Sequence, residues 1–111
     1  MKVFISQPMC GLTEREIFNT MMEAIFDCRE IYKYTDGITI LESYFRETEE
    51  NKDIKNEPLY LLGKSITLMA EADVVYFCKG WEKARGCKLE HACALAYGID
   101  IIEDYKKEKT K

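Results

Sequence analysis

Four short runs of apolar, strand-forming residues alternate along the chain with longer segments whose residues favour helix. The runs are residues 2–6, 38–41, 74–78 and 99–102, and each contains β-branched side chains. Strands separated by single helices are joined by right-handed crossovers, which make the strands parallel. The alternation therefore predicts a small three-layer α/β sandwich, Rossmann-like or flavodoxin-like, with a four-stranded parallel sheet in the order 2-1-3-4.

The segments between these runs carry the start signals of helices. Thr13 and Glu16 have the spacing of a capping box, in which each side chain satisfies a backbone N–H group of the other residue. The helix that follows is expected to reach about Tyr34. Pro58 suits the first turn of a second helix, whose cap is expected at residues 56–57.

The stretch from Ala72 to Tyr97 is the unit around which the rest of the chain is organised. It predicts a strand, a loop over residues 79–86 and a helix from about Cys87, ended by Gly98. The expected inward face of this helix carries Leu89, Ala92, Cys93 and Ala96. Ligands of open parallel sheets bind at the carboxyl ends of the strands. A crevice is therefore expected between the first and third strands.

The composition bounds the class of protein. The 111 residues are expected to form a single domain, 1–111. A net charge of −4 argues against binding of long nucleic acids, which need a basic face, but not against a small phosphorylated ligand. No apolar run approaches the roughly 20 residues of a membrane span. Five cysteines without a signal peptide predict reduced thiols in the cytoplasm.

Residues 42–57 are polar and mostly acidic, and they are expected to form a long loop. Loops of this length in compact domains are often lids or binding segments. The alternative is a solvated excursion without a function of its own.

Glu90 is the residue best placed for chemistry at the crevice. It would lie in or near the first turn of the last helix, where the helix dipole favours an ionised carboxylate. Such a carboxylate can act as a nucleophile or stabilise a developing positive charge. The alternative is that Glu90 only complements the dipole at the surface. Asp73 begins its strand, at the opposite end of the sheet, and is interpreted as structural.

The thiols and the lone histidine raise a metal site as an alternative. Cys87 and His91 are four residues apart on one helix, and Cys78 and Cys93 are nearby in sequence. The chain has no CxxC pair, however, and zinc ligands are usually more closely spaced. No metal is therefore expected, and His91 is interpreted as a surface or interface residue. A reactive Cys10 is an alternative of similarly low weight.

Residues around the expected crevice suit recognition of a small molecule. Gly86 would allow close approach of a ligand. Arg85 could hold a phosphate through forked hydrogen bonds, or be a solvated loop charge. Trp81 could stack on a nucleobase or pack at a subunit interface. The absence of GxGxxG and P-loop patterns argues against a dinucleotide-binding domain and an NTPase, although the helix after Thr13 could hold an anion at its start.

Five segments of the chain carry a further signal: residues 4–9, 62–65, 72–75, 80–90 and 94–102. Together they resemble the nucleoside 2-deoxyribosyltransferase-like superfamily, which includes nucleoside 5′-monophosphate N-glycosidases. The resemblance covers nearly the whole chain and is closest to a small branch found in bacteria and phages. It is more specific for the fold than for the activity.

The resemblance implies an enzyme, a transferase or hydrolase, that acts on the N-glycosidic bond of a nucleoside or nucleotide. In such enzymes the residue matching Glu90 attacks the anomeric carbon of the sugar through an oxocarbenium-like transition state. The resemblance also implies a homodimer or larger homo-oligomer whose subunits complete one another's pockets, and it implies no metal or organic cofactor. A non-catalytic nucleotide-binding or sequestering protein, and an assembly role, stay open as alternatives.

Two positions depart from the pattern of that superfamily. Ser65 stands where relatives carry an aspartate that assists the leaving base, and Ala84 stands where the monophosphate glycosidases carry a serine. The residues expected to contact the substrate are Ser6, Gln7, Pro8, Met9, Ser65, Gly80, Trp81, Arg85 and Gly86.

Overall fold

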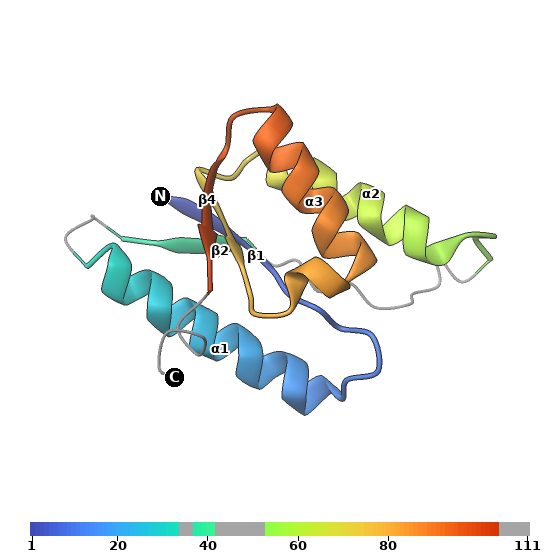
Figure 1. Ribbon diagram of the computed structural model, residues 1–111, viewed down its shortest axis with the longest axis horizontal. Coiled ribbons are helices and arrows are strands. Elements are labelled where there is room, and N and C mark those ends of the chain that lie inside the picture. The colour runs from blue at the N-terminus through green and yellow to red at the C-terminus, as the bar shows by residue number, and fades with distance from the viewer. Residues whose placement is uncertain (34–36, 42–52, 105–111) are drawn as a thin grey trace.

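The computed structural model describes residues 1–33, 37–41 and 53–104, which form a three-layer α/β sandwich (Figure 1). Its elements in chain order are β1 (Lys2–Ser6), α1 (Glu14–Ile31), β2 (Thr39–Leu41), α2 (Glu57–Met69), β3 (Val74–Phe77), the short 3₁₀ helix η1 (Trp81–Lys83), α3 (Arg85–Ala96) and β4 (Asp100–Glu103). The strands are parallel and lie in the order β2-β1-β3-β4. The predicted fold class and strand order are therefore confirmed.

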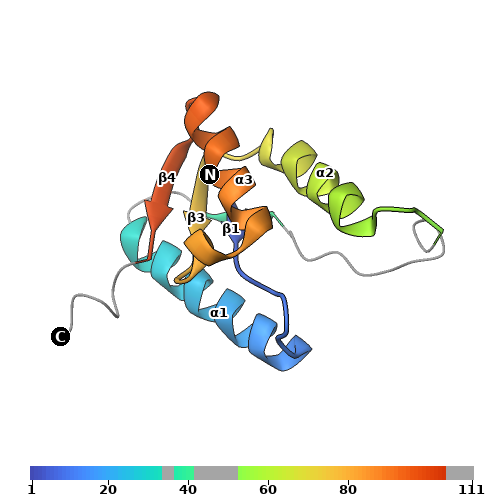
Figure 2. The ribbon, with the colours of Figure 1, turned by 45° about the vertical axis from the view of Figure 1, so that its right-hand side comes forward.

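Helices cover both faces of the sheet, which is why the central strands are buried on both sides from Val3 to Ser6 and from Val74 to Phe77. Helix α1 lies on one face, and α2 and α3 lie on the other (Figures 1 and 2). Alternate residues of β1 and β3 point to opposite faces. On the α1 side the buried cluster is Val3, Ile5, Ala24, Cys28, Val74, Tyr76 and Cys78. On the other side it is Phe4, Met69, Val75, Phe77 and Ala94.

The helix starts follow the signals in the sequence. The Glu16 N–H donates to Thr13 Oγ1 at 3.1 Å, and the Thr13 N–H donates to Glu16 Oε1 at 2.9 Å, which confirms the capping box. Helix α1 ends at Ile31, earlier than expected, and Tyr34 lies outside the described residues. Helix α2 is capped by Asn56, whose Oδ1 accepts from the Leu59 N–H at 3.1 Å.

Helix α3 differs from its prediction in both its start and its buried face. It begins at Arg85, two residues early, after an extended Ala84 that provides no side-chain cap. Its buried residues are Cys87, Glu90 and Ala94, whereas Leu89, Ala92 and Ala96 of the expected inward face are exposed and Cys93 is half-buried. Hydrophobic spacing selected the wrong face, because this helix turns a carboxylate toward the protein interior.

The remaining expectations concern the edges of the fold. Asp73 Oδ2 accepts from the Lys2 N–H at 2.7 Å, which ties the starts of β1 and β3 together and supports a structural role for this carboxylate. Gly98 follows the cap of α3 with φ +71°, a conformation that favours glycine.

The expected loop falls largely on residues 42–52, outside the described part of the chain. Among the described helices none is both long and apolar enough to span a membrane.

Candidate functional site

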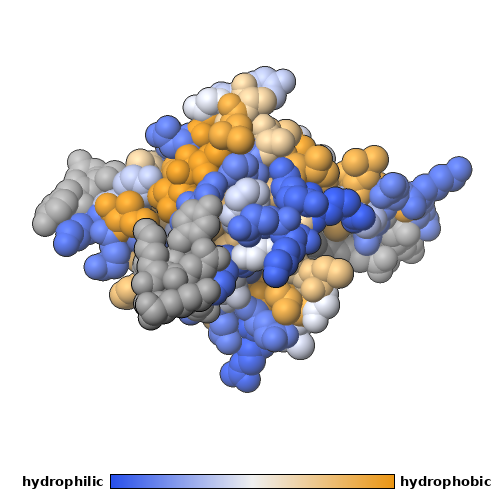
Figure 3. All heavy atoms as spheres, viewed as in Figure 1, coloured by the Kyte–Doolittle hydropathy of each residue, from blue (hydrophilic) through white to orange (hydrophobic). Residues whose placement is uncertain are grey.

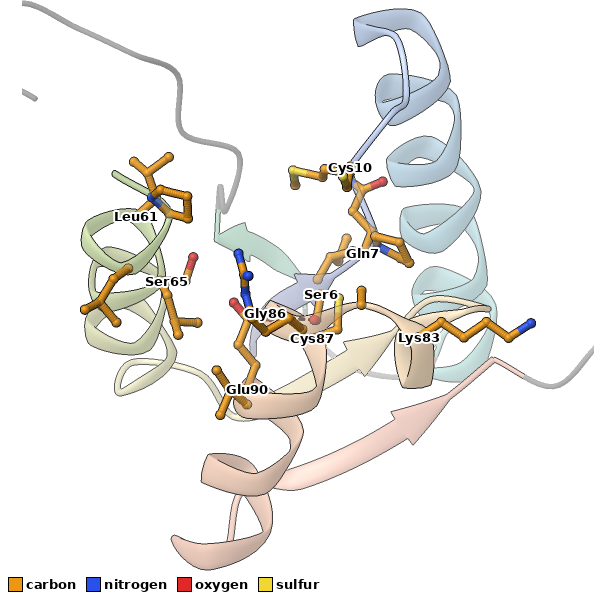
Figure 4. Close-up of a pocket in the computed structure, with 18 of the residues that line it drawn as sticks. Ser6, Gln7, Cys10, Leu61, Ser65, Lys83, Gly86, Cys87 and Glu90 are labelled. Carbon is orange, nitrogen blue, oxygen red and sulfur yellow. Dashed lines mark hydrogen bonds between the residues drawn. The ribbon is translucent and has the colours of Figure 1, made fainter. Parts of the chain in front are cut away.

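A cavity of about 780 Å³ opens at the carboxyl end of β1, beside the segment that leads from β3 into α3. These two strands flank the point where the strand order reverses, which is the usual ligand site of open α/β sheets. The turn after β1 forms one wall and α2 forms the opposite wall, with the start of α3 between them (Figure 4). Of the residues expected to contact substrate, the cavity is lined by Ser6, Gln7, Pro8, Met9, Ser65, Arg85 and Gly86.

Glu90 lies at the base of this cavity and is only 7% exposed. The Ser6 hydroxyl, from the end of β1, donates to Glu90 Oε1 at 2.5 Å. Ser65 of α2 is also buried and lies on the opposite side of the cavity from Gln7 (Figure 4). Three elements thus meet around one carboxylate, and one of its oxygens is held by a hydroxyl.

The charge state of Glu90 is set by burial rather than by the helix dipole. Because α3 begins at Arg85, Glu90 lies in the second turn, near the first turn rather than in it. Burial raises the pKa of the Glu90 carboxyl above its ordinary value. The hydroxyls of Ser6 and Ser65 partly offset this by hydrogen bonding to the ionised form. An ionised Glu90 is therefore more basic than a solvated carboxylate.

This raised pKa makes a prediction about stability. Below the unfolded pKa the carboxyl is protonated in both states, and that neutral form carries no penalty for burial. As the pH rises through the folded pKa, ionisation of the buried group lowers the stability of the native state. Glu90→Gln removes this titration and keeps an acceptor for Ser6. We expect its Tm to exceed that of the wild type by several °C at pH 8, since each kcal/mol shifts Tm by roughly 5 °C.

The measurement is thermal unfolding of both proteins followed by circular dichroism from pH 4 to pH 9. The Tm difference should shrink toward the acidic end of the series. A gap of constant size across the series would contradict the assignment of the effect to Glu90 ionisation.

Cys87 also lines the cavity, although the sequence analysis did not place it among the substrate contacts. Burial raises its pKa to about 11, so its thiol is neutral at physiological pH. The wall from α2 was missed as well: Pro58, Leu61 and Leu62 line the cavity beside Ser65. Residues 61, 62 and 65 share one side of a helix, and this spacing could have revealed the wall.

Gly80 and Trp81, two expected substrate contacts, do not line this cavity. Trp81 stacks on His91, with ring centroids 4.0 Å apart and planes 11° from parallel. His91 Nε2 lies 2.7 Å from Glu103 Oε2, and the His91 side chain is half-buried. Gly80 has φ +91° and passes close to Pro8. Trp81 and His91 thus connect η1 with α3, and the contact of His91 with Glu103 connects α3 with β4. Trp81 packs inside the domain and is not available to a ligand in the cavity.

Gln7 presents a different feature. It is 5% exposed, and within the described part of the chain neither polar atom of its side chain has a hydrogen-bond partner. An unpartnered buried amide destabilises a protein by about 1–3 kcal/mol. Because Gln7 lines the cavity, its amide is available to hydrogen-bond a ligand there.

The charged residues near the cavity lie at its rim. Arg85 and Lys83 are exposed, and Lys83 extends away from Ser6 and Glu90 (Figure 4). Glu90 is the one carboxylate among the described residues that line the cavity. No group of three or more His, Cys, Asp or Glu side chains in residues 1–33, 37–41 and 53–104 is arranged to hold a metal ion. Cys10 lies at the outer edge and is exposed.

The fold and the site together define a parallel α/β protein with a buried carboxylate in a cavity at the switch point of its sheet. The sequence matches the family described as "Domain of unknown function (DUF4406)" over residues 1–103, and the chain belongs to this family. No curated protein and no solved structure gives a significant match to the chain.

Proposed function

We propose that the protein cleaves or transfers the N-glycosidic bond of a nucleoside or nucleotide, with Glu90 as the nucleophile. The observation that carries this proposal is the buried Glu90 carboxylate at the base of the cavity, held by Ser6 at 2.5 Å. Ser6 engages Oε1, and we assign the attack on the substrate to Oε2. The resemblance to the nucleoside 2-deoxyribosyltransferase-like superfamily supplies the substrate class.

The proposed reaction has two steps. Glu90 Oε2 attacks the anomeric carbon of the sugar, and the base leaves with the electron pair of the C–N bond and takes a proton from solvent. The transition state resembles an oxocarbenium ion, which a nearby carboxylate stabilises. Water, or a second base in a transferase, then attacks the same carbon and releases Glu90.

The presence of Ser65 instead of an acidic residue limits which leaving bases the proposed enzyme can release. A hydroxyl is a poor acid at neutral pH, and general acid catalysis contributes typically 10²–10⁴-fold to rates. In this site the Ser65 hydroxyl favours the ionised form of the Glu90 carboxyl. The proposed enzyme therefore depends on the stability of the departing base.

We accordingly expect cationic leaving groups to react faster. N7-methylated purine nucleotides, whose base departs neutral, should release base about 10–100-fold faster than the unmodified nucleotides, within the range that general acids supply. The measurement is release of free base by chromatography for matched pairs of substrates, corrected for spontaneous hydrolysis. Equal corrected rates within each pair would show that protonation of the base does not limit the reaction.

The start of α3 supports a phosphorylated substrate. Its first N–H groups have no side-chain cap, and no acidic residue lies in its first turn. Such a helix end attracts anions, and Arg85 at the first helical position could add a forked hydrogen bond to a phosphate. Ala84 lacks the hydroxyl of the monophosphate glycosidases, so phosphate recognition here would use backbone groups and Arg85.

A non-catalytic nucleotide binder is the second candidate. Ser65 favours it, because the acid expected beside the leaving base is missing. The two candidates are separated by incubating the pure protein with a panel of nucleosides and nucleotides, then measuring both free base and ligand-induced change in Tm. Free base identifies the enzyme, whereas a raised Tm with intact ligand identifies the binder, since a ligand of the native state stabilises it.

Two further expectations stay proposals. We propose a cytoplasmic location, supported by five free cysteines. We also propose that a neighbouring subunit completes the cavity, as the superfamily resemblance implies. No long nucleic acid, membrane, metal or organic cofactor is needed by the proposed reaction.

A further inference from the structure

Gln7 is a buried polar residue whose side chain makes no hydrogen bond within the described part of the chain. Figure 3 shows hydrophilic side chains spread over the surface of the molecule, where water supplies their hydrogen bonds. Gln7 is only 5% exposed, and neither its Oε1 nor its Nε2 has a partner. Since both atoms lack a partner, this holds whichever way the amide group is turned.

Two other residues carry a buried atom without a partner, and they allow a comparison. These atoms are Trp81 Nε1 and Glu57 Oε2, and neither residue lines the cavity. Gln7 does line it, on the opposite side from Ser65 (Figure 4). Of the buried side-chain atoms left unpaired in residues 1–33, 37–41 and 53–104, those at the cavity therefore belong to the amide of Gln7.

The chemistry of this amide limits which ligand group can satisfy it. Nε2 offers two donors, and Oε1 is an acceptor. An ionised phosphate or carboxylate has only acceptors, so it would leave Oε1 unpaired. A nucleobase edge with an amino group beside a ring nitrogen pairs with both atoms at once, as glutamine side chains do with adenine in DNA. An edge with a keto oxygen beside an N–H group pairs equally well after the amide has turned over.

The position of Gln7 also suits the base of a nucleotide. Gln7 directly follows Ser6, whose hydroxyl donates to Glu90. In the proposed reaction the base is bonded to the carbon that Glu90 attacks, so a bound base lies close to these residues. A glutamine side chain has three rotatable bonds, and its amide can therefore turn toward a base without movement of the backbone.

We propose that Gln7 determines specificity for the base, through two hydrogen bonds to an edge on which a donor stands beside an acceptor. This inference rests on the proposed function for the presence of a nucleotide, and it adds which part of the base the site selects. The amide is unpaired in the free protein and paired in the complex.

The first test measures binding by calorimetry in a Glu90→Gln background, which does not consume the ligand. The probes are two matched pairs that differ by one amino group, each in ribose and 2-deoxyribose forms. The pairs are adenosine 5′-monophosphate with purine riboside 5′-monophosphate, and cytidine 5′-monophosphate with pyrimidin-2-one riboside 5′-monophosphate. The amino compound of at least one pair should bind about 10-fold more tightly or better, because its counterpart leaves Gln7 Oε1 unpaired. Equal binding within both pairs, or no binding of any probe, overturns the proposal.

The second test replaces the residue itself. Methionine has a length and flexibility similar to those of glutamine but no amide, so Gln7→Met in the same background should abolish the difference within the pair. Ribose 5-phosphate is the matched control ligand, because it has no base, and its binding should be the same with and without Gln7→Met. A difference between the nucleotides that persists in Gln7→Met would assign the selectivity to another residue.

The stability of the free protein distinguishes recognition of a ligand from a structural role. Because the Gln7 amide has no partner, Gln7→Met removes a buried unpaired polar group, and the Tm of the free protein should rise by several °C. A lower Tm would show that the amide supports the fold and would refute its role in recognition.

The outcomes separate this inference from the proposed reaction. Selective binding without release of free base would support recognition by Gln7 and identify the protein as a binder. Release of base by the wild type, with equal binding within both pairs, would support the reaction and overturn the role of Gln7.

Discussion

Replacing Glu90 with glutamine is expected to lower the rate of base release by at least about 1,000-fold, as removal of a catalytic nucleophile does in other enzymes. The amide keeps the size of the side chain and an acceptor for the Ser6 hydroxyl, which donates to Glu90 at 2.5 Å. It cannot form the glycosyl ester or offset the positive charge that develops on the sugar. The measurement is free base released from the best substrate of the panel at saturating concentration.

The matched control is Glu82→Gln, an exposed position on η1 that does not line the cavity. It should leave the rate unchanged. Folding is checked independently by the Tm of Glu90→Gln at pH 8, which is expected to exceed that of the wild type. Retention of the wild-type rate by Glu90→Gln would remove Glu90 from the role of nucleophile.

A rescue experiment separates a missing nucleophile from a disturbed cavity. In Glu90→Ala the space of the side chain becomes vacant, and added formate can enter it as a replacement carboxylate. Formate should raise the rate of Glu90→Ala and leave that of the wild type unchanged. The absence of rescue together with normal ligand binding would argue against a nucleophilic role for the Glu90 carboxylate.

Replacing Tyr76 with alanine is expected to lower the free energy of unfolding by about 3–5 kcal/mol, the range for removal of a buried aromatic ring. Tyr76 is 2% exposed in the cluster between the sheet and α1, and its hydroxyl donates to Asp27 Oδ2 at 2.6 Å. Single domains are stable by about 5–15 kcal/mol in total. The variant should therefore lie near the limit of folding, as measured by urea denaturation.

Tyr97→Ala is the matched control, since Tyr97 is 84% exposed after the end of α3. It should change stability by no more than about 0.5 kcal/mol. Tyr76→Phe keeps the ring and removes only the hydroxyl, so it should cost about 1–2 kcal/mol. Similar losses for Tyr76→Ala and Tyr97→Ala would contradict the packing of α1 on the sheet.

Patterns within short segments were sufficient for the architecture. The strand β1 was predicted with the bounds it has, because the apolar residues Val3, Phe4 and Ile5 lie between Lys2 and a turn that follows Ser6. The capping box of Thr13 and Glu16 fixed the start of α1, since both partners of its hydrogen bonds lie within four residues. The parallel direction of the strands followed from their alternation with helices, which makes the connections crossovers. These features depend on neighbours along the chain, and the sequence records such neighbours directly.

The predicted face of α3 was wrong for the opposite reason. Glu90 is 84 positions from Ser6, and its burial depends on β1, α2 and α3 meeting at one end of the sheet. A hydrophobicity pattern places carboxylates outward, because it contains no information about a distant hydroxyl that lowers the penalty for burial. Trp81 was misplaced in the same way, since its stacking partner His91 comes from another element.

The sequence by itself determined a parallel α/β domain and the end of the sheet where a ligand would bind, whereas the expected strand order was established by the structure. Only the tertiary structure decided that Glu90 is buried, that Ser6 holds one of its oxygens and that Gly80 and Trp81 lie behind the cavity wall. The physical reason is the range of the interactions. Helix caps and strands form between near neighbours, whereas the pKa and orientation of a buried carboxylate are set by groups that meet only when the chain has folded.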